Sequence, residues 1–333
     1  MNYADFIFPV LIAYAVVLIL GPFLIPWLRK LKVGNTEREE LKSHQVKNGT
    51  PTMGGLLILA GLTVATLIFA GKYPKVLPAL ILTWGYAIIG FLDDYLKVVL
   101  KRSDGLLSYQ KMLLQIVVTG IFAAYMVLFS GNDLTLLVPF SQYFVAGGYY
   151  LNAGFLTIPL MFFAVIGTAN GVNFTDGLDG LLSTVTIPVS LFFVIASYYK
   201  MEQVSLLPLA VLGALMGFLM YNAYPAKIFM GDTGSLALGG YVAGMAYLLK
   251  LPLFLPIVGF IYFVEVLSVM IQVSYFKYTK KKYGEGRRIF RMTPIHHHYE
   301  LKGYSETKVV AFFSIVTALL CLVGFAGICG GKL

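Results

Sequence analysis

The amino-acid sequence predicts an all-α polytopic integral membrane protein, and three observations lead to that fold class. Hydrophobic residues make up 58% of the 333 positions, whereas charged residues make up only 12%. The mean hydropathy is +0.80, which a water-soluble domain of this length could sustain only with large exposed apolar patches. Apolar runs of about 20 residues, the length a helix needs to cross a bilayer, recur along the whole chain. We therefore expect a single membrane-embedded domain over residues 1–333.

About ten apolar stretches are candidate transmembrane helices. The first ends in Arg29, Lys30 and Lys32 and lacks a basic leading region and a small-residue cleavage site, so we expect a retained anchor with its N-terminus outside. The loop between the fifth and sixth stretches is very short. The predicted spans are 5–28, 53–71, 77–96, 111–130, 154–172, 177–199, 204–221, 233–249, 253–276 and 308–330.

The distribution of basic residues predicts the orientation of these spans. With the N-terminus outside, the inward loops hold 20 of the 25 Lys and Arg residues, as is typical of cytoplasmic loops, and the C-terminus is also outside. The net charge of +9 therefore indicates attraction to membrane lipids and anionic substrates, and no nucleic acid is expected as a partner.

Two loops have a composition that predicts local structure. The outward loop 131–153 is rich in aromatic and β-branched residues and could form a short β-hairpin. The segment from Lys277 to Arg291 interleaves basic residues with Tyr and Phe. It could form an amphipathic inner loop with an interfacial helix on lipid headgroups, or it could be only the strongest topological signal.

Five carboxylates mark the candidate site. Asp93 and Asp94 lie in GFLDDYLK, Asp176 and Asp179 lie in NFTDGLDG, and Asp232 lies in FMGDTGS. Each group falls at the end of an apolar run on the predicted inner side. Ionisable groups at the edge of a hydrocarbon slab are costly and are usually retained for function.

The spacing of these residues limits what each can do. Asp93 and Asp94 point about 100° apart on a helix, so we expect different roles for them. Asp93 and Lys97 share a helix face and could simply form an ion pair. One group recurs every three residues and could line one broad helical face, or could cap the following helix. This group is Asn170, Asn173, Asp176 and Asp179.

Hard oxygen ligands without nearby cysteine favour magnesium, and adjacent lysines favour a phosphorylated substrate. Cys321 and Cys329 are eight residues apart on a predicted helix, or about 12 Å, which is too far for a disulfide.

The histidine run at 296–298 is internal to the chain. Three consecutive imidazoles diverge on a helix, so contacts of one or two of them with phosphate are favoured over a zinc site. Glu265 lies within the ninth predicted span. It could be a proton relay or a buried carboxylate bonded to a neighbouring helix, and it is left outside the predicted site.

Several motifs together resemble one enzyme family. The sequence resembles the phospho-N-acetylmuramoyl-pentapeptide transferases, a branch of the polyprenyl-phosphate N-acetylhexosamine-1-phosphate transferase superfamily, over its full length. The acidic motifs are shared across the superfamily, whereas PTMGG together with the triple histidine is specific to this branch. VGNTEREELKS departs from the Gly-Pro that relatives commonly carry before the first motif. The motifs are HQVKNGTPTMGG at 44–55, GFLDDYLK at 90–97, ANGVNFTDGLDGL at 169–181, NAYPAKIFMGDTGSL at 222–236 and PIHHHYE at 294–300.

The resemblance implies a magnesium-dependent transfer at the cytoplasmic face of the bacterial plasma membrane. UDP-N-acetylmuramoyl-pentapeptide would give its phospho-sugar to undecaprenyl phosphate, yielding lipid I and UMP in the first membrane step of peptidoglycan synthesis. The resemblance also implies a homodimer.

The resemblance further implies roles for individual residues. Asp232 would bind magnesium, Asp93 would act as the base, and Asp94 and Asp176 would position metal and diphosphate, with Asp176 also a metal ligand. Phosphate-binding lysines would be Lys97 and Lys111, and His297 would act at the sugar-phosphate end. Expected substrate-binding residues are Lys47, Thr52, Asn170, Asn173, Gly177, Leu178, Asp179, Asn222, Phe229, His296 and His298.

Three alternatives remain at this point. A sister transferase would move N-acetylglucosamine-1-phosphate to the same lipid. A secondary transporter would place acids near the membrane midplane and would usually show inverted repeats, whereas these acids gather at one face. A scaffold would explain the spans but not the carboxylates.

Overall fold

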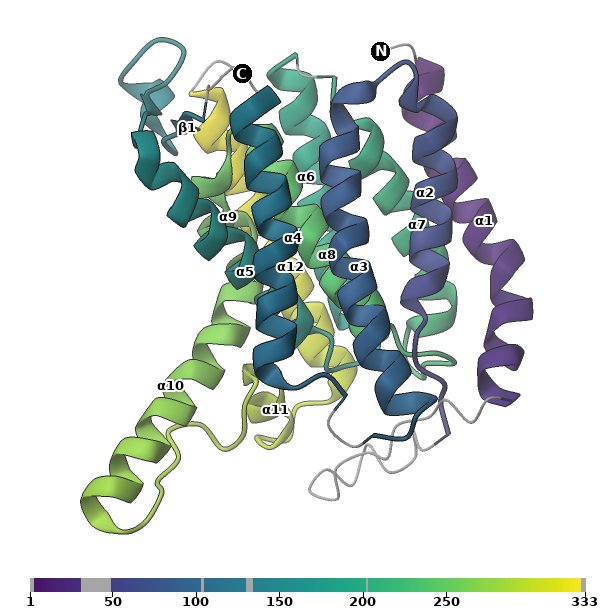
Figure 1. Cartoon of the computed structure of the whole chain (residues 1–333), viewed down its shortest axis with the longest axis vertical. Helices are drawn as coiled ribbons and strands as arrows, with labels where there is room; N and C mark the ends of the chain where they lie inside the picture. The colour runs from purple at the N-terminus through teal and green to yellow at the C-terminus, as the bar shows by residue number, and fades with distance from the viewer. Residues whose placement is uncertain (1–2, 31–48, 103–104, 130–133, 202, 331–333) are drawn as a thin grey trace.

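The computed structural model describes residues 3–30, 49–102, 105–129, 134–201 and 203–330. It is a bundle of mostly long helices (Figure 1). The helices are α1 (Tyr3–Lys30), α2 (Gly55–Ala70), α3 (Leu77–Val98), α4 (Ser108–Phe129), α5 (Thr157–Thr175), α6 (Leu181–Tyr199), α7 (Leu206–Asn222), α8 (Gly231–Leu248), α9 (Leu255–Val258), α10 (Phe260–Tyr283), α11 (Ile295–Glu300) and α12 (Glu306–Cys329).

The helical bundle is consistent with a multi-pass membrane protein. Within the described ranges, seven helices are long and apolar enough to cross a membrane, and α2 and α7 are shorter apolar helices. Nine of the predicted spans each fall mainly on one helix, and the ninth is divided between α9 and α10. The start of α1 and the end of α12 lie at the same end (Figure 1). Ten membrane crossings and termini outside stay predictions.

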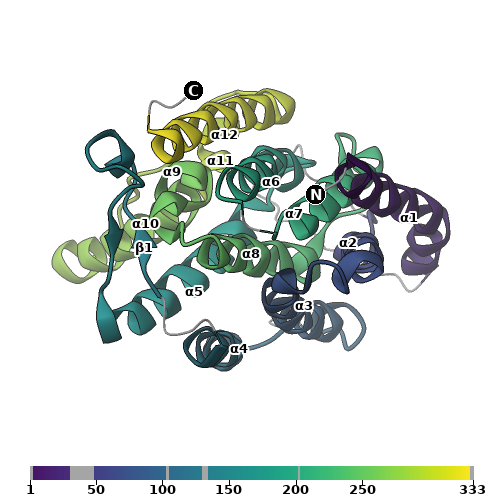
Figure 2. The same ribbon diagram turned by 90° about the horizontal axis from the view of Figure 1, so that it is seen from above.

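Helix α8 forms the centre of the bundle, with α2, α3, α5 and α6 around it (Figure 2). Glycines let its neighbours approach closely. A Cβ atom at Gly90 of α3 would lie 2.0 Å from the carbonyl oxygen of Asp232, and one at Gly55 of α2 would lie 2.2 Å from the backbone nitrogen of Gly234. Small residues at helix contacts allow such backbone packing. The first turn of α8 is therefore held directly against α2 and α3.

The ninth predicted span, 253–276, differs from the observed helices. The chain forms the short helix α9, breaks at Gly259, and then continues as α10 to Tyr283. A left-handed Gly284, with φ of 79°, ends α10. The basic segment therefore does not begin a separate helix at Lys277, because α10 continues through it to Tyr283. Its contact with lipid headgroups stays a prediction. Figure 1 shows α10 extending away from the bundle before the chain returns to α11.

The predicted β-hairpin is confirmed in short form, whereas its position outside the membrane stays a prediction. Strands β1 (Leu136–Leu137) and β2 (Tyr150–Leu151) pair antiparallel. Both cysteines are free and buried, as their spacing predicted.

Candidate active site

Five predicted residues from four helices converge at one end of the bundle. The start of α1 and the end of α12 lie at the opposite end. Asp93 and Lys97 come from the end of α3, Lys111 from the first turn of α4, Asn173 from the end of α5, and Asp232 from the first turn of α8. The Nζ atoms of Lys97 and Lys111 lie 3.2 Å and 3.0 Å from Oδ2 of Asp232. Asn173 donates a hydrogen bond of 2.8 Å to Oδ1 of the same carboxylate. The cluster therefore centres on Asp232.

Asp93 is the second carboxylate of this cluster. Its Oδ2 atom lies 2.6 Å from Nζ of Lys97 and 3.7 Å from Nζ of Lys111. The backbone N–H of Leu106 donates to Oδ1 at 2.7 Å. The predicted Asp93–Lys97 ion pair is thus present, but Asp232 shares both lysines with it.

Asp94 turns to a different set of partners, as the helical geometry predicted. Its Oδ2 atom accepts hydrogen bonds from the backbone N–H and the hydroxyl of Thr233, at 2.8 Å and 2.6 Å. Its Oδ1 atom accepts a bond of 3.2 Å from the backbone N–H of Asp232. The first N–H groups of a helix have no partner within the helix. Asp94 supplies partners for two of them and so fixes the turn that carries Asp232.

Asp176 follows the last residue of α5 and joins the same region. The backbone of Gly231, the first residue of α8, is among the groups that act on its carboxylate. Burial raises the pKa of Asp176 well above its ordinary 3.8, and the negative charges of Asp232 and Asp94 raise this pKa further. Burial and the neighbouring carboxylates therefore both disfavour the ionised form of Asp176.

The charge balance tests whether magnesium fits here. Two lysines accompany Asp93, Asp94, Asp176 and Asp232, which leaves two negative charges in excess when all four carboxylates are ionised. The described residues contain no group of three or more His, Cys, Asp or Glu side chains placed as a metal cage. Magnesium usually takes only one or two carboxylates and completes its shell with water and phosphate. The donor set therefore fits a divalent cation bound together with a diphosphate.

Asn170 does not face the cluster. Its amide donates to Oε1 of Gln115 and to the carbonyl of Ile166, each at 2.8 Å. The predicted common face from Asn170 to Asp179 is wrong, because α5 ends at Thr175 and the chain then turns.

Two further predicted substrate-binding residues, Asp179 and Asn222, form hydrogen bonds with the backbone of loops. Oδ2 of Asp179 accepts a bond of 2.9 Å from the backbone of Ala226. Asn222 accepts from the backbone of Gly180 at 3.1 Å and donates to the carbonyl of Ile228 at 3.0 Å. Because both side chains are buried, these contacts assign them to holding the loop after α5 against the loop before α8.

Three other predicted substrate-binding residues have little or limited exposure. Thr52 and Leu178 are buried, and Phe229 is half-buried. The backbone of Phe229 pairs with Pro51 and Gly54, each through a bond of 2.8 Å. Lys47 lies outside the described residues.

The three histidines have three different partners. The Nδ1 atom of His297 lies 2.7 Å from Oε2 of Glu300. His298 accepts a bond of 3.1 Å at Nδ1 from the backbone of Arg291. His296 is buried, with Nδ1 3.0 Å from Oε1 of Glu265. Their polar partners differ, as predicted for consecutive residues on a helix, but the rings of His296 and His297 are in contact, with centroids 4.1 Å apart. The predicted divergence is therefore only partial.

His296 connects the histidine segment to the loop beside the carboxylates. A Cβ atom at Gly177 would lie 2.1 Å from Nε2 of His296, so only glycine allows this contact. Sequence reasoning left Glu265 outside the site, although it is the buried partner that fixes His296. The available signal was a carboxylate inside an apolar span of a chain that also carries a histidine motif.

Comparisons with known proteins cover this site. A model described as glycosyl transferase family 4 matches residues 76–250, which include the whole carboxylate and lysine cluster. A phospho-N-acetylmuramoyl-pentapeptide-transferase signature matches residues 47–59.

Full-length relatives agree with these matches. A phospho-N-acetylmuramoyl-pentapeptide-transferase of Acetivibrio thermocellus is 46% identical over 327 residues, covering 97% of this chain and 96% of the relative. One of Clostridioides difficile is 43% identical over 331 residues, covering 98% and 99%. The chain therefore belongs to the phospho-N-acetylmuramoyl-pentapeptide-transferase family.

Proposed function

We propose that this protein transfers phospho-N-acetylmuramoyl-pentapeptide from its UDP derivative to undecaprenyl phosphate, giving lipid I and UMP. The reaction would take place at the cytoplasmic face of the bacterial plasma membrane, as the first membrane step of peptidoglycan synthesis. The observation that carries the proposal is the convergence of Lys97, Lys111 and Asn173 on Asp232, in a chain whose full-length relatives bear the transferase name.

The proposed chemistry is a phosphoanhydride exchange. An oxygen of the lipid phosphate attacks the phosphorus next to the sugar and forms a new P–O bond. The bond to UMP breaks, and its electron pair leaves with the UMP oxygen. Negative charge spreads over the phosphoryl oxygens during this step, so catalysis depends on positioning and charge neutralisation. Lys97 and Lys111 reach the same carboxylate oxygen, so both ammonium groups are available to a diphosphate bound there.

Asp232 and Asp176 would hold Mg²⁺, which when bound would supply further neutralisation of the diphosphate. Asn173 fixes one oxygen of Asp232, and Asp94 fixes the backbone of its helical turn. These contacts would keep the carboxylate in a single orientation before substrate arrives.

Asp93 is the proposed base, and in a two-step route it would be the nucleophile. The second pKa of a phosphate monoester is about 6, so the acceptor is mostly ionised at neutral pH and needs little help from a base. A two-step route would instead form a covalent phospho-muramoyl adduct on Asp93 and release UMP before the lipid acts. Incubation with the UDP substrate but without lipid separates these routes, because only the two-step route gives a stoichiometric burst of UMP.

The uridine and sugar parts of the donor would lie against the loops around the cluster. Phe229 is the candidate for stacking on uracil, and Lys47 belongs to the same proposed nucleotide pocket. Thr52 is a further proposed substrate-binding residue. The histidine segment, with His297 foremost, would recognise the sugar-phosphate end. We further propose a homodimer, in contact with membrane lipids.

The first experiment measures UMP release by purified protein in detergent with undecaprenyl phosphate. It compares UDP-N-acetylmuramoyl-pentapeptide with UDP-N-acetylglucosamine, each with and without magnesium. The test variant is Asp232→Asn. The control is Asp5→Asn, which removes a carboxylate near the start of α1, at the other end of the bundle, where Asp5 accepts a hydrogen bond from Tyr73.

Magnesium-dependent release from the muramoyl substrate, lost in Asp232→Asn and kept in Asp5→Asn, is the expected result. Release from UDP-N-acetylglucosamine instead would contradict the proposed substrate. Full activity of Asp232→Asn would contradict the proposed site.

A further inference from the structure

A polar pocket lies at the end of the bundle opposite the carboxylate cluster. Its volume is about 320 Å³. Asp232 lies in the first turn of α8, whereas the pocket residue Lys250 follows the last turn, so the helix length of about 27 Å separates the two regions. The walls come from the hairpin, the ends of α6 and α12, and the segment after α8. Its central polar residues are Gln142, Tyr150, Lys200 and Lys250.

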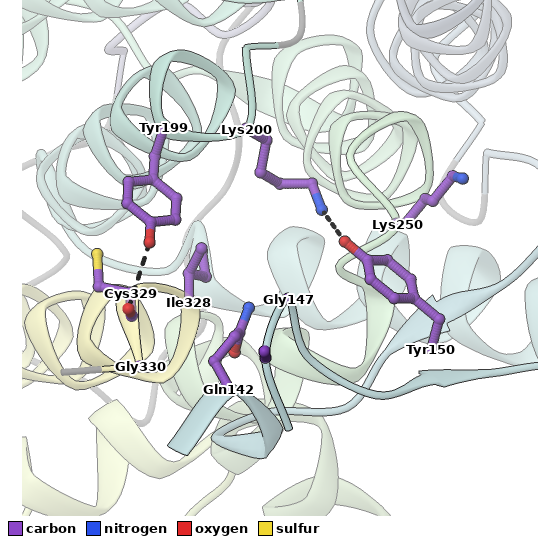
Figure 3. Close-up of a pocket in the computed structure, with 10 residues that line it drawn as sticks. Gln142, Gly147, Tyr150, Tyr199, Lys200, Lys250, Ile328, Cys329 and Gly330 are labelled. Atoms are coloured by element: carbon purple, nitrogen blue, oxygen red, sulfur yellow. Dashed lines mark hydrogen bonds between the residues drawn. The ribbon is translucent and has the colours of Figure 1, made fainter. Parts of the chain in front are cut away.

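Lys200 and Tyr150 meet across this pocket (Figure 3). The Nζ atom of Lys200 donates a hydrogen bond of 2.9 Å to the hydroxyl of Tyr150. It also lies 5.1 Å from the centre of the Tyr150 ring, and Nζ of Lys250 lies 5.9 Å from the same centre. Two cationic groups from different helix ends therefore share a single tyrosine.

Gln142 approaches from another side of the pocket (Figure 3). Its Oε1 atom is buried and has no hydrogen-bond partner among the described residues. A buried amide oxygen without a partner costs free energy. An incoming ligand or water with a hydroxyl to donate would remove that cost.

The position of Lys200 and Lys250 at helix ends does not fully explain why both lie beside Tyr150. A cation after the last turn of a helix interacts favourably with the helix dipole, which accounts for a lysine at each position. Lys250, however, has a left-handed backbone with φ of 59°, a conformation that glycine usually supplies. The backbone N–H of Leu137 in β1 donates to the Lys250 carbonyl at 2.9 Å. The hairpin thus holds Lys250 in place and also provides Tyr150 from β2.

We propose that this pocket binds a phosphate group, carried either by an anionic lipid headgroup or by a soluble phosphate. The ammonium groups of Lys200 and Lys250 and the hydroxyl of Tyr150 supply charge-assisted donors to the phosphate oxygens. No Asp or Glu lines the pocket among the described residues. Exposed apolar side chains lie beside it in the sequence, since Phe144 is 88% and Tyr198 is 72% exposed. Acyl chains of a bound lipid would cover such residues.

The test measures lipid binding to the full-length protein by native mass spectrometry in a neutral detergent. Phosphatidylglycerol is compared with diacylglycerol of the same acyl chains, which lacks the phosphate. Lys200→Gln removes one cation from the pocket. Lys75→Gln is the matched control, because it removes one lysine near the same end of the bundle but outside the pocket. Tyr150→Phe removes only the hydroxyl and keeps the ring, so it tests the same site with little risk to folding.

The expected result is tight binding of one phosphatidylglycerol molecule, with the dissociation constant raised about tenfold in Lys200→Gln and unchanged in Lys75→Gln. Loss of one charge-assisted hydrogen bond corresponds to about this factor. Tyr150→Phe should raise the constant less. Competition by millimolar inorganic phosphate would identify a soluble phosphate as ligand, and absence of competition would identify the lipid. Equal binding of both lipids without any binding of inorganic phosphate, or equal affinity in Lys200→Gln and Lys75→Gln, would overturn the proposal.

Discussion

Asp94→Asn should destabilise the protein and slow the transfer through a single cause, the loss of the anchor for the first turn of α8. The Asp94 carboxylate accepts three hydrogen bonds from Asp232 and Thr233. Asparagine has only one acceptor oxygen. It can retain the two bonds from Thr233, but its amide NH₂ group would then face the backbone N–H of Asp232.

The magnitude follows from these three contacts. Each retained bond loses its charge assistance, which is worth about 1 kcal/mol, and the unpaired N–H of Asp232 costs about 1–3 kcal/mol. The uncharged amide avoids part of the cost of burying a carboxylate, which offsets some of this loss. We therefore expect the free energy of unfolding to fall by about 2 kcal/mol and the apparent Tm by about 3–6 °C.

The same change should lower kcat by about 100-fold, because a small displacement of a positioned group has an effect of that size. The assay combines UMP release with thermal unfolding in one detergent. Thr233→Val is the control, since it removes only the hydroxyl bond of 2.6 Å and leaves both backbone bonds. It should therefore have a smaller effect on both quantities. A lower kcat with an unchanged Tm would refute the anchoring argument, because Asp94 would then act on the substrate directly.

Three further predictions concern the surrounding residues. Gly177→Ala should abolish most activity, because the added Cβ would lie 2.1 Å from Nε2 of His296, whereas Gly167→Ala meets nothing within 4 Å and should be neutral by the same UMP assay. Lys111→Gln should reduce kcat about 10²–10³-fold through loss of charge neutralisation at the phosphoryl oxygens, measured as initial rates at saturating substrate. Burial and the positive charges of nearby basic residues lower the pKa of His298 below its ordinary 6.5. As the pH falls, the unfolded chain therefore binds a proton at His298 before the folded chain does. The contribution of His298 to stability is full above pH 6.5 and decreases below it. Thermal unfolding should show a smaller decrease in His298→Gln.

Controls and contrary outcomes differ for these three. Full activity of Gly177→Ala would contradict the close contact between the loop and the histidine segment. The control for Lys111→Gln is Lys101→Gln, which changes an exposed lysine between α3 and α4 and should have little effect. Equal losses in both variants would indicate a general charge effect. For His298, an identical pH dependence in the variant would assign the decrease to other groups.

The sequence alone determined the class of the fold and the position of its helices. Apolar runs of about 20 residues decide membrane-helix placement locally, so the predicted spans fall on observed helices, with only the ninth divided between α9 and α10. The motifs determined the family for a similar reason, because they are contiguous. The residues at which the helices end were less predictable. The end of α10 at Gly284 depends on a single left-handed residue, and the apolar pattern does not mark it.

Only the tertiary structure decided which predicted residues share a site. Asp232 contacts lysines that lie 135 and 121 positions earlier in the chain. Close packing at Gly90 holds α3, which carries the first of these lysines, against the start of α8. Periodicity placed Asn170 beside Asn173, yet the two amides bond to different helices. The sequence likewise marked Glu265 as an unusual carboxylate in an apolar span, but its partner His296 is known only from the packing of α11 against α10. A helical pattern fixes the face on which a side chain lies, whereas its partner depends on which distant helix packs against that face.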